Sequence, residues 1–231
     1  MGKKKVYVIF GLTGILLFSL LVAAGDLEPS GPPASTMKTL EDVEPRIPIH
    51  ALDLPLTITE PGSYYLVEDV NFTDVPNNAI TIQCDDVTID LSGYTLKGSD
   101  SGACNGIYIV GRRNVEIRNG TIRDFTLPGI HEASGSGEGH RIINVRSLYN
   151  AFGIYLNGDG HLIKDCTVTS NNHHGIYTGS GSTIIGNVVR DNTDYGIYAV
   201  SYCLVDQNTM YNNGTSMFTG TGCKVGLNVA P

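Results

Sequence analysis

The sequence contains no tryptophan, and charged residues make up only 16% of its 231 residues. So few charges argue against a coiled coil or a charged disordered tail. Basic residues are also scarcer than acidic ones, 15 against 23, which gives a formal net charge of −8. A nucleic-acid-binding protein needs a basic surface to displace counterions from phosphate, so the composition argues against nucleic acid as a partner.

Cysteine is scarce, and the number of cysteines is odd. The five are Cys84, Cys104, Cys166, Cys203 and Cys223. No two of them form a C-x-x-C pair, so the sequence gives no support for a zinc site. An odd number leaves at least one thiol free or paired between chains.

The N-terminus has the layout of an export signal. Lys3, Lys4 and Lys5 precede an uncharged apolar run over residues 6–24, which ends in small residues suited to cleavage. We expect residues 1–24 to be a signal peptide, or an uncleaved membrane anchor because the apolar run is long. Either outcome places the rest of the chain outside the cytoplasm, as a secreted, periplasmic or cell-surface protein.

The segment after the signal differs from everything that follows. Residues 25–44 are rich in proline, serine and acidic residues, and we expect them to form a disordered linker. Residues 45–231 are expected to fold as one domain, with residues 45–78 as its N-terminal cap. Within the cap, residues 56–70 alternate apolar and polar side chains around Pro61-Gly62, a pattern typical of a hairpin.

Glycine is abundant, and the dipeptide Gly-Ile recurs at nearly constant intervals. It begins at Gly106, Gly129, Gly153, Gly175 and Gly196, with spacings of 23, 24, 22 and 21 residues. A pair of apolar residues follows in each unit. We assign these pairs as Ile117/Ile122, Ile143/Leu148, Ile163/Val168, Ile184/Val189 and Val205/Met210.

These units predict an all-β solenoid. The apolar segments are short and β-branched, they lack a helical period, and Gly, Asn and Asp interrupt them. A unit of this size cannot bury its own apolar face, but stacked units bury a continuous core. We therefore expect a right-handed parallel β-helix of about six to seven coils, spaced by ~4.8 Å.

The stretches GIYIVGRRNVEIRNGTIRDF and GIYLNGDGHLIKDCTVTSNNHHGIYTGSGSTIIGNVVRDN resemble the right-handed parallel β-helix repeat family, with the pectin-lyase-like fold. The resemblance covers roughly residues 56–231. Upstream stretches such as AITIQCDDVTIDLSGYTL are similar to exported bacterial β-helix proteins without an assigned function. The resemblance implies a fold but no single activity, because this fold carries lyases, glycosidases, epimerases, adhesins and phage tailspikes.

Stacking converts the repeat into columns of side chains. The isoleucine of each Gly-Ile is expected to point inward, and the next residue outward, because side chains alternate along a strand. The outward column is Tyr108, His131, Tyr155, Tyr177 and Tyr198. It is either an aromatic ladder that stabilises the stacked strands or a strip that binds sugars, and both roles are compatible.

Turn residues form a further pair of expected columns. The first is Phe125, Ala151, Asn171, Asn192 and Asn213, and the one beside it is Asp124, Asn150, Ser170, Asp191 and Asn212. Asn and Asp favour turns, so a structural role is expected here. Calcium at Asp124 or Asp191 has little support because no second carboxylate falls at the neighbouring positions, and we expect no cofactor.

A disulfide between Cys84 and Cys104 is one prediction for an exported protein, with two free thiols as the alternative. Cys203 and Cys223 occupy equivalent positions of the last two coils. Parallel neighbours in register suit disulfide geometry poorly, so two packed thiols are expected there at least as readily as a bridge.

Candidate chemistry gathers on the tyrosine face. His131 and Glu132 follow one Gly-Ile, while His173 and His174 precede another, and Asp194 and Tyr195 precede the next. A histidine beside a tyrosine could exchange protons with a sugar. The candidate substrate-binding residues are Tyr108, His131, Tyr155, His174, Tyr177, Tyr195 and Tyr198. No diagnostic motif of the epimerases or polygalacturonases of this fold is present, so no residue is assigned as catalytic.

The sequence thus supports two kinds of function. One is a polysaccharide-binding protein, or a lyase, glycosidase or epimerase that cleaves or modifies a glycan along the Tyr/His face. The other is a non-enzymatic envelope scaffold or adhesin. The C-terminal segment GTGCKVGLNVAP has little with which to cap the last coil. Exposed strand edges invite pairing, so a homodimer through that end is also expected.

Overall fold

The computed structural model describes residues 45–133 and 135–230. The predicted signal or anchor, residues 1–24, and the predicted linker, residues 25–44, lie outside the described residues. Contacts between residues define a compact unit over Pro45–Pro231. Among the described residues, no helix is long and apolar enough to cross a membrane.

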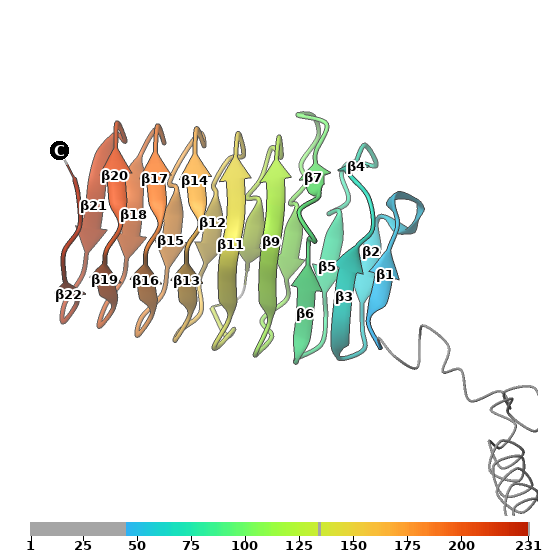
Figure 1. The fold of residues 1–231 in the computed structure, drawn as a ribbon, viewed down its shortest axis with the longest axis horizontal. Coiled ribbons are helices and arrows are strands. Elements are labelled where there is room, and N and C mark those ends of the chain that lie inside the picture. The colour runs from blue at the N-terminus through green and yellow to red at the C-terminus, as the bar shows by residue number, and fades with distance from the viewer. Residues whose placement is uncertain (1–44, 134, 231) are drawn as a thin grey trace, which may run out of the picture. The chain divides into compact units, whose positions relative to one another are not determined.

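Two parallel sheets run the length of this unit, with the coils stacked side by side (Figure 1). The first sheet has eight strands, one from each coil. They are β2 (Leu56–Ile58), β5 (Ile80–Ile82), β8 (Ile107–Ile109), β10 (Ile130–Glu132), β12 (Ile154–Leu156), β15 (Ile176–Thr178), β18 (Tyr195–Ala199) and β21 (Thr215–Thr219). We call it the short-strand sheet.

The second sheet has 14 strands. Its main path is β1 (Ile47–Ile49), β3 (Gly62–Leu66), β6 (Val87–Asp90), β9 (Glu116–Arg123), β11 (Arg141–Leu148), β13 (Leu162–Lys164), β16 (Thr183–Ile185), β19 (Leu204–Asp206) and β22 (Lys224–Val225). Joined to it are β4 (Val70–Asn71), β7 (Thr95–Lys97), β14 (Thr167–Thr169), β17 (Val188–Arg190) and β20 (Thr209–Tyr211). The one helix among the described residues is the 3₁₀ turn η1 (Ala51–Asp53).

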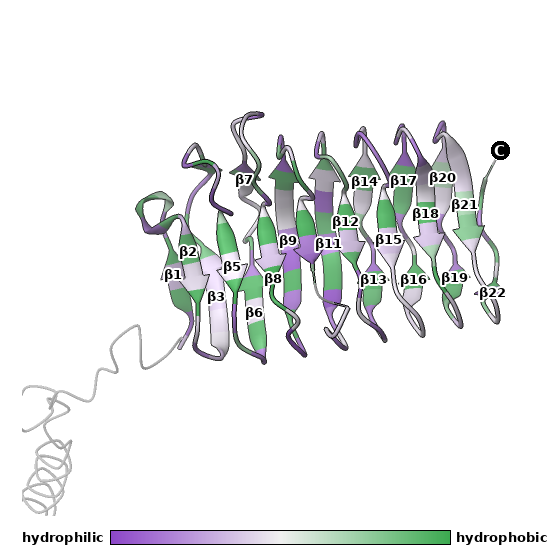
Figure 2. Ribbon diagram, turned by 180° about the vertical axis from the view of Figure 1, so that it is seen from behind, coloured by the Kyte–Doolittle hydropathy of each residue, from purple (hydrophilic) through white to green (hydrophobic). Residues whose placement is uncertain are grey.

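The core follows from the strand pattern. In the three-residue strands of the short-strand sheet, the first and third residues face inward and the middle residue faces outward. The predicted inward column Ile107, Ile130, Ile154, Ile176 and Ile197 is fully buried, as expected. Figure 2 shows the resulting apolar bands, which recur from coil to coil in both sheets. The prediction of an all-β parallel β-helix is therefore confirmed.

The N-terminal segment differs from the prediction in two ways. The expected hairpin over residues 56–70 is wrong, because β2 and β3 lie in different sheets and each pairs in parallel, β2 with β5 and β3 with β6. The segment therefore supplies strands to the stack, and the coil number is about eight where six to seven were expected.

One coil was placed out of register by a single residue. The partners of Ile117 and Ile122 in β9 are Ile142 and Ser147, and not Ile143 and Leu148. Hydrophobicity favoured the wrong pair because the residue that occupies the inward position here is a buried serine. A one-residue slip exchanges the two faces of a strand, so the turn that follows was also misassigned.

The corrected turn contains a continuous asparagine ladder. Asn150, Asn171, Asn192 and Asn213 stack, and each side-chain carbonyl accepts the backbone N–H of the preceding coil over 3.0–3.1 Å. Asn150 belongs in this column in place of Ala151. The residue beside Asp124 and Ser170 is then Tyr149, which sequence analysis did not place. The ladder joins the coils because the backbone N–H of one asparagine donates to the side-chain oxygen of the next.

Candidate functional site: an aromatic face

The seven candidate residues all lie on the outside of the short-strand sheet. The strand register aligns Tyr108, His131, Tyr155, Tyr177 and Tyr198 in one column, as expected from the repeat. The last coil extends this column with Phe218, paired with Tyr198. Phe218 was missed because its strand reads Ser-Met-Phe where four other coils read Gly-Ile-Tyr. We call this column and its flanking residues the aromatic face.

The rings of the column stack on one another. Ring centroids lie 4.4 Å apart for Tyr155 and Tyr177, 5.1 Å for Tyr177 and Tyr198, and 4.4 Å for Tyr198 and Phe218, with interplanar angles of 15°, 18° and 22°. Neighbouring rings therefore cover the flat faces, and the ring edges and phenol hydroxyls point to solvent. Such a ladder stabilises the stacked strands, and it presents a row of hydroxyl groups with little open ring surface.

His131 interrupts this stack. Its ring meets Tyr108 at 72° and Tyr155 at 78°, and its Nδ1 lies 3.1 Å from the side-chain oxygen of the buried Asn105. That contact assigns a proton to Nδ1, because an amide oxygen can only accept. Burial lowers the pKa of His131, while the nearby Glu132 opposes the shift. His131 is thus a neutral member of the ladder near pH 7.

A second row of residues flanks the column. Phe152 stacks on His173 at 4.7 Å, and His174 lies parallel to Tyr198 at 5.6 Å. Tyr195 meets the edge of His174 at 5.4 Å. The predicted residues His174 and Tyr195 therefore belong to the face but stand beside the column. Phe152 precedes Gly153 as His174 precedes Gly175, and this repeat was the signal that could have identified it.

Asp194 lies beside two adjacent histidines and holds His173 through a hydrogen bond. Its carboxylate lies 3.1 Å from Nδ1 of His173 and 3.6 Å from Nδ1 of His174. The backbone N–H of Tyr195 donates to Nδ1 of His174 over 3.4 Å, which leaves the proton of that ring on Nε2. His173 instead donates from Nδ1 to the carboxylate, so its Nε2 is free to accept a proton. This pairing is the chemical requirement for a general base.

The groups on the face are mainly uncharged near neutral pH. Burial lowers the pKa of His174, with Asp194 opposing the shift and His173 adding to it. Burial raises the pKa of Tyr155, and burial with the neighbouring tyrosines raises that of Tyr177. The phenols therefore keep their protons, and each can both donate and accept a hydrogen bond.

The family model for the right handed beta helix region matches residues 58–214, which is more than half of the chain. The chain belongs to the right-handed β-helix family. No curated protein matches its sequence significantly.

Solved structures with a similar fold include the Dettilon tailspike protein (TM-score 0.51, 17% identity, 78% of this chain) and ORF18 of Geobacillus virus E2 (0.52, 12%, 79%). The A-module of mannuronan C-5 epimerase from Azotobacter vinelandii aligns with a TM-score of 0.43 at 16% identity over 79% of this chain. The alignments span 39%, 50% and 66% of those chains. At such identities the likeness to the two viral proteins shows the fold alone.

The interior of this β-helix holds a carboxylate where sequence analysis expected a solvated one. Glu132 is the third residue of β10 and is fully buried, because it occupies the inward position held by Ile109 and Leu156 in the adjacent strands. Its Oε2 accepts the backbone N–H of Gly158 over 2.7 Å. Glu132 therefore holds the turn of the next coil and has no place on the aromatic face.

Two histidines form a second buried feature, which sequence analysis did not select. His140 and His161 are 0% and 2% exposed, and their rings stack at 4.9 Å. Each Nδ1 accepts a backbone N–H, from Val115 and from His140 respectively, so each proton lies on Nε2. Both Nε2 atoms are buried without a hydrogen-bond partner among the described residues. The signal in the sequence was the tetrapeptide Gly-x-Gly-His, repeated one coil apart at residues 137–140 and 158–161.

The electrostatics around this pair keep it neutral. Burial, with His161 as the next cause, lowers the pKa of His140 to about 3, while Asp85 opposes the shift. Burial also lowers the pKa of His161, and Glu132, the Gly158 backbone and Asp159 oppose this shift. The two imidazoles are therefore neutral near pH 7 and serve as acceptors for the backbone N–H groups.

The predicted disulfide between Cys84 and Cys104 is not formed, and all five cysteines are free thiols. The register pairs Ile80 with Ile107, so Cys104 precedes one end of the short-strand sheet while Cys84 follows the other end. Two cysteines at opposite ends of parallel strands cannot reach bonding distance. Cys203 and Cys223 pack together, and the backbone N–H of Cys203 donates to Sγ of Cys223 over 3.3 Å. Within the described ranges, no group of three or more potential ligands is arranged to hold a metal ion.

Proposed function

We propose that this β-helix binds a polysaccharide along the aromatic face, with the sugar chain lying across successive coils. The observation that carries the proposal is the row of phenol hydroxyls at Tyr155, Tyr177 and Tyr198, repeated once per coil. Equivalent groups recur here at a regular strand spacing of ~4.8 Å, which suits a polymeric ligand with a short repeat. Sugar hydroxyls suit phenols, imidazoles and a carboxylate as hydrogen-bond partners.

The stacked geometry changes how the ligand is held. Because neighbouring rings cover each other, recognition relies on hydrogen bonds from ring edges more than on sugar rings lying flat on aromatic faces. His173 and Asp194, at the edge of the same surface, add a base and an acceptor. These two residues support a secondary proposal of glycan cleavage or modification. In that reaction, Nε2 of His173 would accept the proton that the sugar loses.

An extracytoplasmic location and pairing of two chains remain part of the proposal. The location rests on residues 1–24, whose composition is typical of an export signal. The proposed pairing rests on exposed apolar side chains in and after β22, namely Val225, Leu227 and Val229.

Replacing the three phenols by phenylalanine tests the proposal. We expect the full-length variant Tyr155→Phe/Tyr177→Phe/Tyr198→Phe to keep its thermal stability, since Phe218 shows that phenylalanine fits the stack. Its affinity for the polysaccharide should fall about tenfold or more, because each lost hydrogen bond is worth about 0.5–1.5 kcal/mol. Calorimetric titration with neutral and uronate oligosaccharides measures the loss.

The matched control is Tyr94→Phe, which removes one phenol hydroxyl from a partly exposed tyrosine in a turn outside the aromatic face. Its affinity should equal that of the parent. If the parent bound none of the polysaccharides tested, the scaffold alternative would be supported. If the triple variant bound as tightly as the parent, the binding site would not be the aromatic face. The same samples, assayed for oligosaccharide release, separate binding from cleavage.

A further inference from the structure

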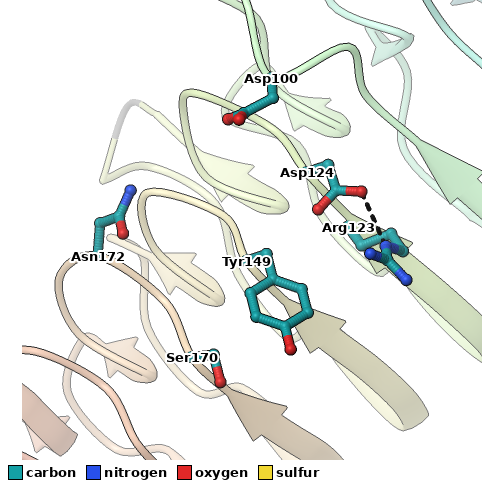
Figure 3. Close-up of a pocket in the computed structure, with 6 residues that line it drawn as sticks. All are labelled: Asp100, Arg123, Asp124, Tyr149, Ser170 and Asn172. Carbon is teal, nitrogen blue, oxygen red and sulfur yellow. Dashed lines mark hydrogen bonds and ion pairs between the residues drawn. The ribbon is translucent and has the colours of Figure 1, made fainter.

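A groove crosses the turns that follow β7, β9, β11 and β14, on a different part of the β-helix from the aromatic face. It has a volume of about 400 Å³ and is open to solvent. Its lining residues come from consecutive coils: Asp100, Arg123, Asp124, Tyr149, Ser170 and Asn172. Figure 3 shows the Tyr149 ring in the middle of this group, with the carboxylate of Asp100 and the amide of Asn172 on the surrounding loops.

The backbone of Tyr149 is in an unfavourable conformation. Its φ is +57°, and the residues at the same turn position in other coils, Asp124, Ser170, Asp191 and Asn212, have φ between +52° and +61°. Short polar residues tolerate this left-handed region, whereas a bulky aromatic residue is an outlier there. Tyrosine is therefore not required by the turn itself, since short polar residues fill the same turn position in the other coils.

That side chain gains little burial in return. Tyr149 is 51% exposed, and its contact among the printed ring interactions is the guanidinium of Arg123, 5.4 Å from the ring centroid. Arg123 is in turn paired with Asp124 over 2.9 Å. The core therefore does not explain the tyrosine, while the groove does, since the ring supplies its apolar surface.

The charges of the groove define the ligand that it suits. Two carboxylates, Asp100 and Asp124, face one guanidinium, so the lining carries a net negative charge. An anionic sugar such as a uronate would meet like charge, which costs affinity. An uncharged sugar offers an apolar C–H face to an aromatic ring and hydroxyls to carboxylate, hydroxyl and amide groups.

We propose that this groove is a second glycan-binding site, which holds one uncharged sugar residue against Tyr149. Asp100, Ser170 and Asn172 receive and donate the hydrogen bonds of the sugar hydroxyls, and Arg123 supports the ring from its own strand. The site shares no residue with the aromatic face, so either site can fail without the other.

The substitution Tyr149→Asn tests this site with two readouts that move separately. Another coil has an asparagine, Asn212, at the same turn position. The substitution therefore relieves the backbone strain and removes the ring. The thermal midpoint should stay the same or rise by about 2–4 °C, because the relief outweighs or balances the lost Arg123 contact. Affinity for uncharged oligosaccharides should fall about tenfold or more.

The matched control is Tyr202→Asn. Tyr202 also has a left-handed backbone, φ +55°, and is 71% exposed, but it lies in a turn outside the groove. Both variants relieve the same strain, and the control should retain full affinity. The probes are cellohexaose, xylohexaose and mannohexaose, with hexagalacturonate as the anionic comparison, titrated into the full chain by calorimetry.

Three outcomes would overturn the inference: no binding of any uncharged probe, equal binding by the parent and Tyr149→Asn, or binding of hexagalacturonate that is tighter than that of the uncharged probes and is lost in Tyr149→Asn. The triple phenylalanine variant of the aromatic face keeps the groove intact. If the triple variant lost binding and Tyr149→Asn did not, the result would therefore support the aromatic face as the binding site and contradict the groove.

Discussion

The free energy of unfolding of this β-helix is expected to fall by roughly 4 kcal/mol as the pH is lowered from 6.5 to 3, because His140 must remain neutral in the folded state. The pKa of His140 is lowered from 6.5 to about 3 by burial. Between pH 6.5 and 3, the unfolded chain therefore binds a proton at this histidine that the folded chain does not bind. The stability is complete above pH 6.5 and is lost as the pH falls toward 3.

Carboxylates also titrate toward the acid end, so the diagnostic window is about pH 6.5 to 4.5, above the ordinary pKa values of Asp and Glu. Urea unfolding across this window should show a steep slope for the parent. The slope should become much shallower in His140→Asn/His161→Asn, with His131 and His174 accounting for the part that remains. Asparagine offers an oxygen at the position of Nδ1 and still accepts the backbone N–H.

The control is His50→Asn, which removes an exposed histidine from the N-terminal turn. It should leave the slope unchanged. An equally steep slope in the double variant would show that acid lability arises from other groups and that the buried imidazole pair tolerates charge.

Removing one amide from the middle of the asparagine ladder is expected to be almost as damaging. In Asn171→Ala, the backbone N–H of Asn150 loses its acceptor at 3.0 Å inside the protein. The side-chain oxygen of Asn192 loses one of its two donors, at 2.9 Å, and keeps the backbone N–H of residue 171. A buried group left without a partner costs about 1–3 kcal/mol, and a lost hydrogen bond about 0.5–1.5 kcal/mol. We expect a loss of about 2–4 kcal/mol in the free energy of unfolding, measured by urea denaturation at pH 7.

The adjacent residue gives the matched comparison. Asn172 is exposed, and Asn172→Ala should change stability by less than about 0.5 kcal/mol. If the two variants were equally stable, the ladder would contribute no more than any solvated asparagine, and the coils would be held by the sheets and the apolar core alone.

The sequence was sufficient to predict the fold class because each residue of the repeat has the same structural role in every coil. The Gly-Ile dipeptides mark the same inward position in five coils, and all five isoleucines are buried. The following residue therefore had to face outward, which located the aromatic column correctly. The coil of β2 and β3 was missed because residues 56–66 lack the Gly-Ile pattern, although β2 pairs in register with β5.

The errors lie where polar residues occupy inward positions. Ser147 and Glu132 face the interior, but an assignment based on hydrophobicity places such residues outside. The first error shifted one coil by a residue and concealed Tyr149, on which the second site depends. The second moved a carboxylate from the core to the aromatic face.

Ring orientation could not be predicted either. Strand register places the tyrosines in a column, but only side-chain packing decides whether their faces are open or covered. The pairing of His173 with Asp194 likewise depends on how two turns of adjacent coils meet. Both features determine how a glycan would be recognised, and neither is a property of sequence spacing.

The most direct test of glycan binding on the aromatic face is a ¹³C spectrum of the full chain with labelled tyrosine rings, recorded during titration with an oligosaccharide that binds. The chain has 12 tyrosines, so each variant described above assigns signals by their loss. The account predicts that Tyr155, Tyr177 and Tyr198 shift together on binding, while Tyr94 and Tyr202 do not. Saturable binding that leaves the three ladder tyrosines unshifted would contradict it.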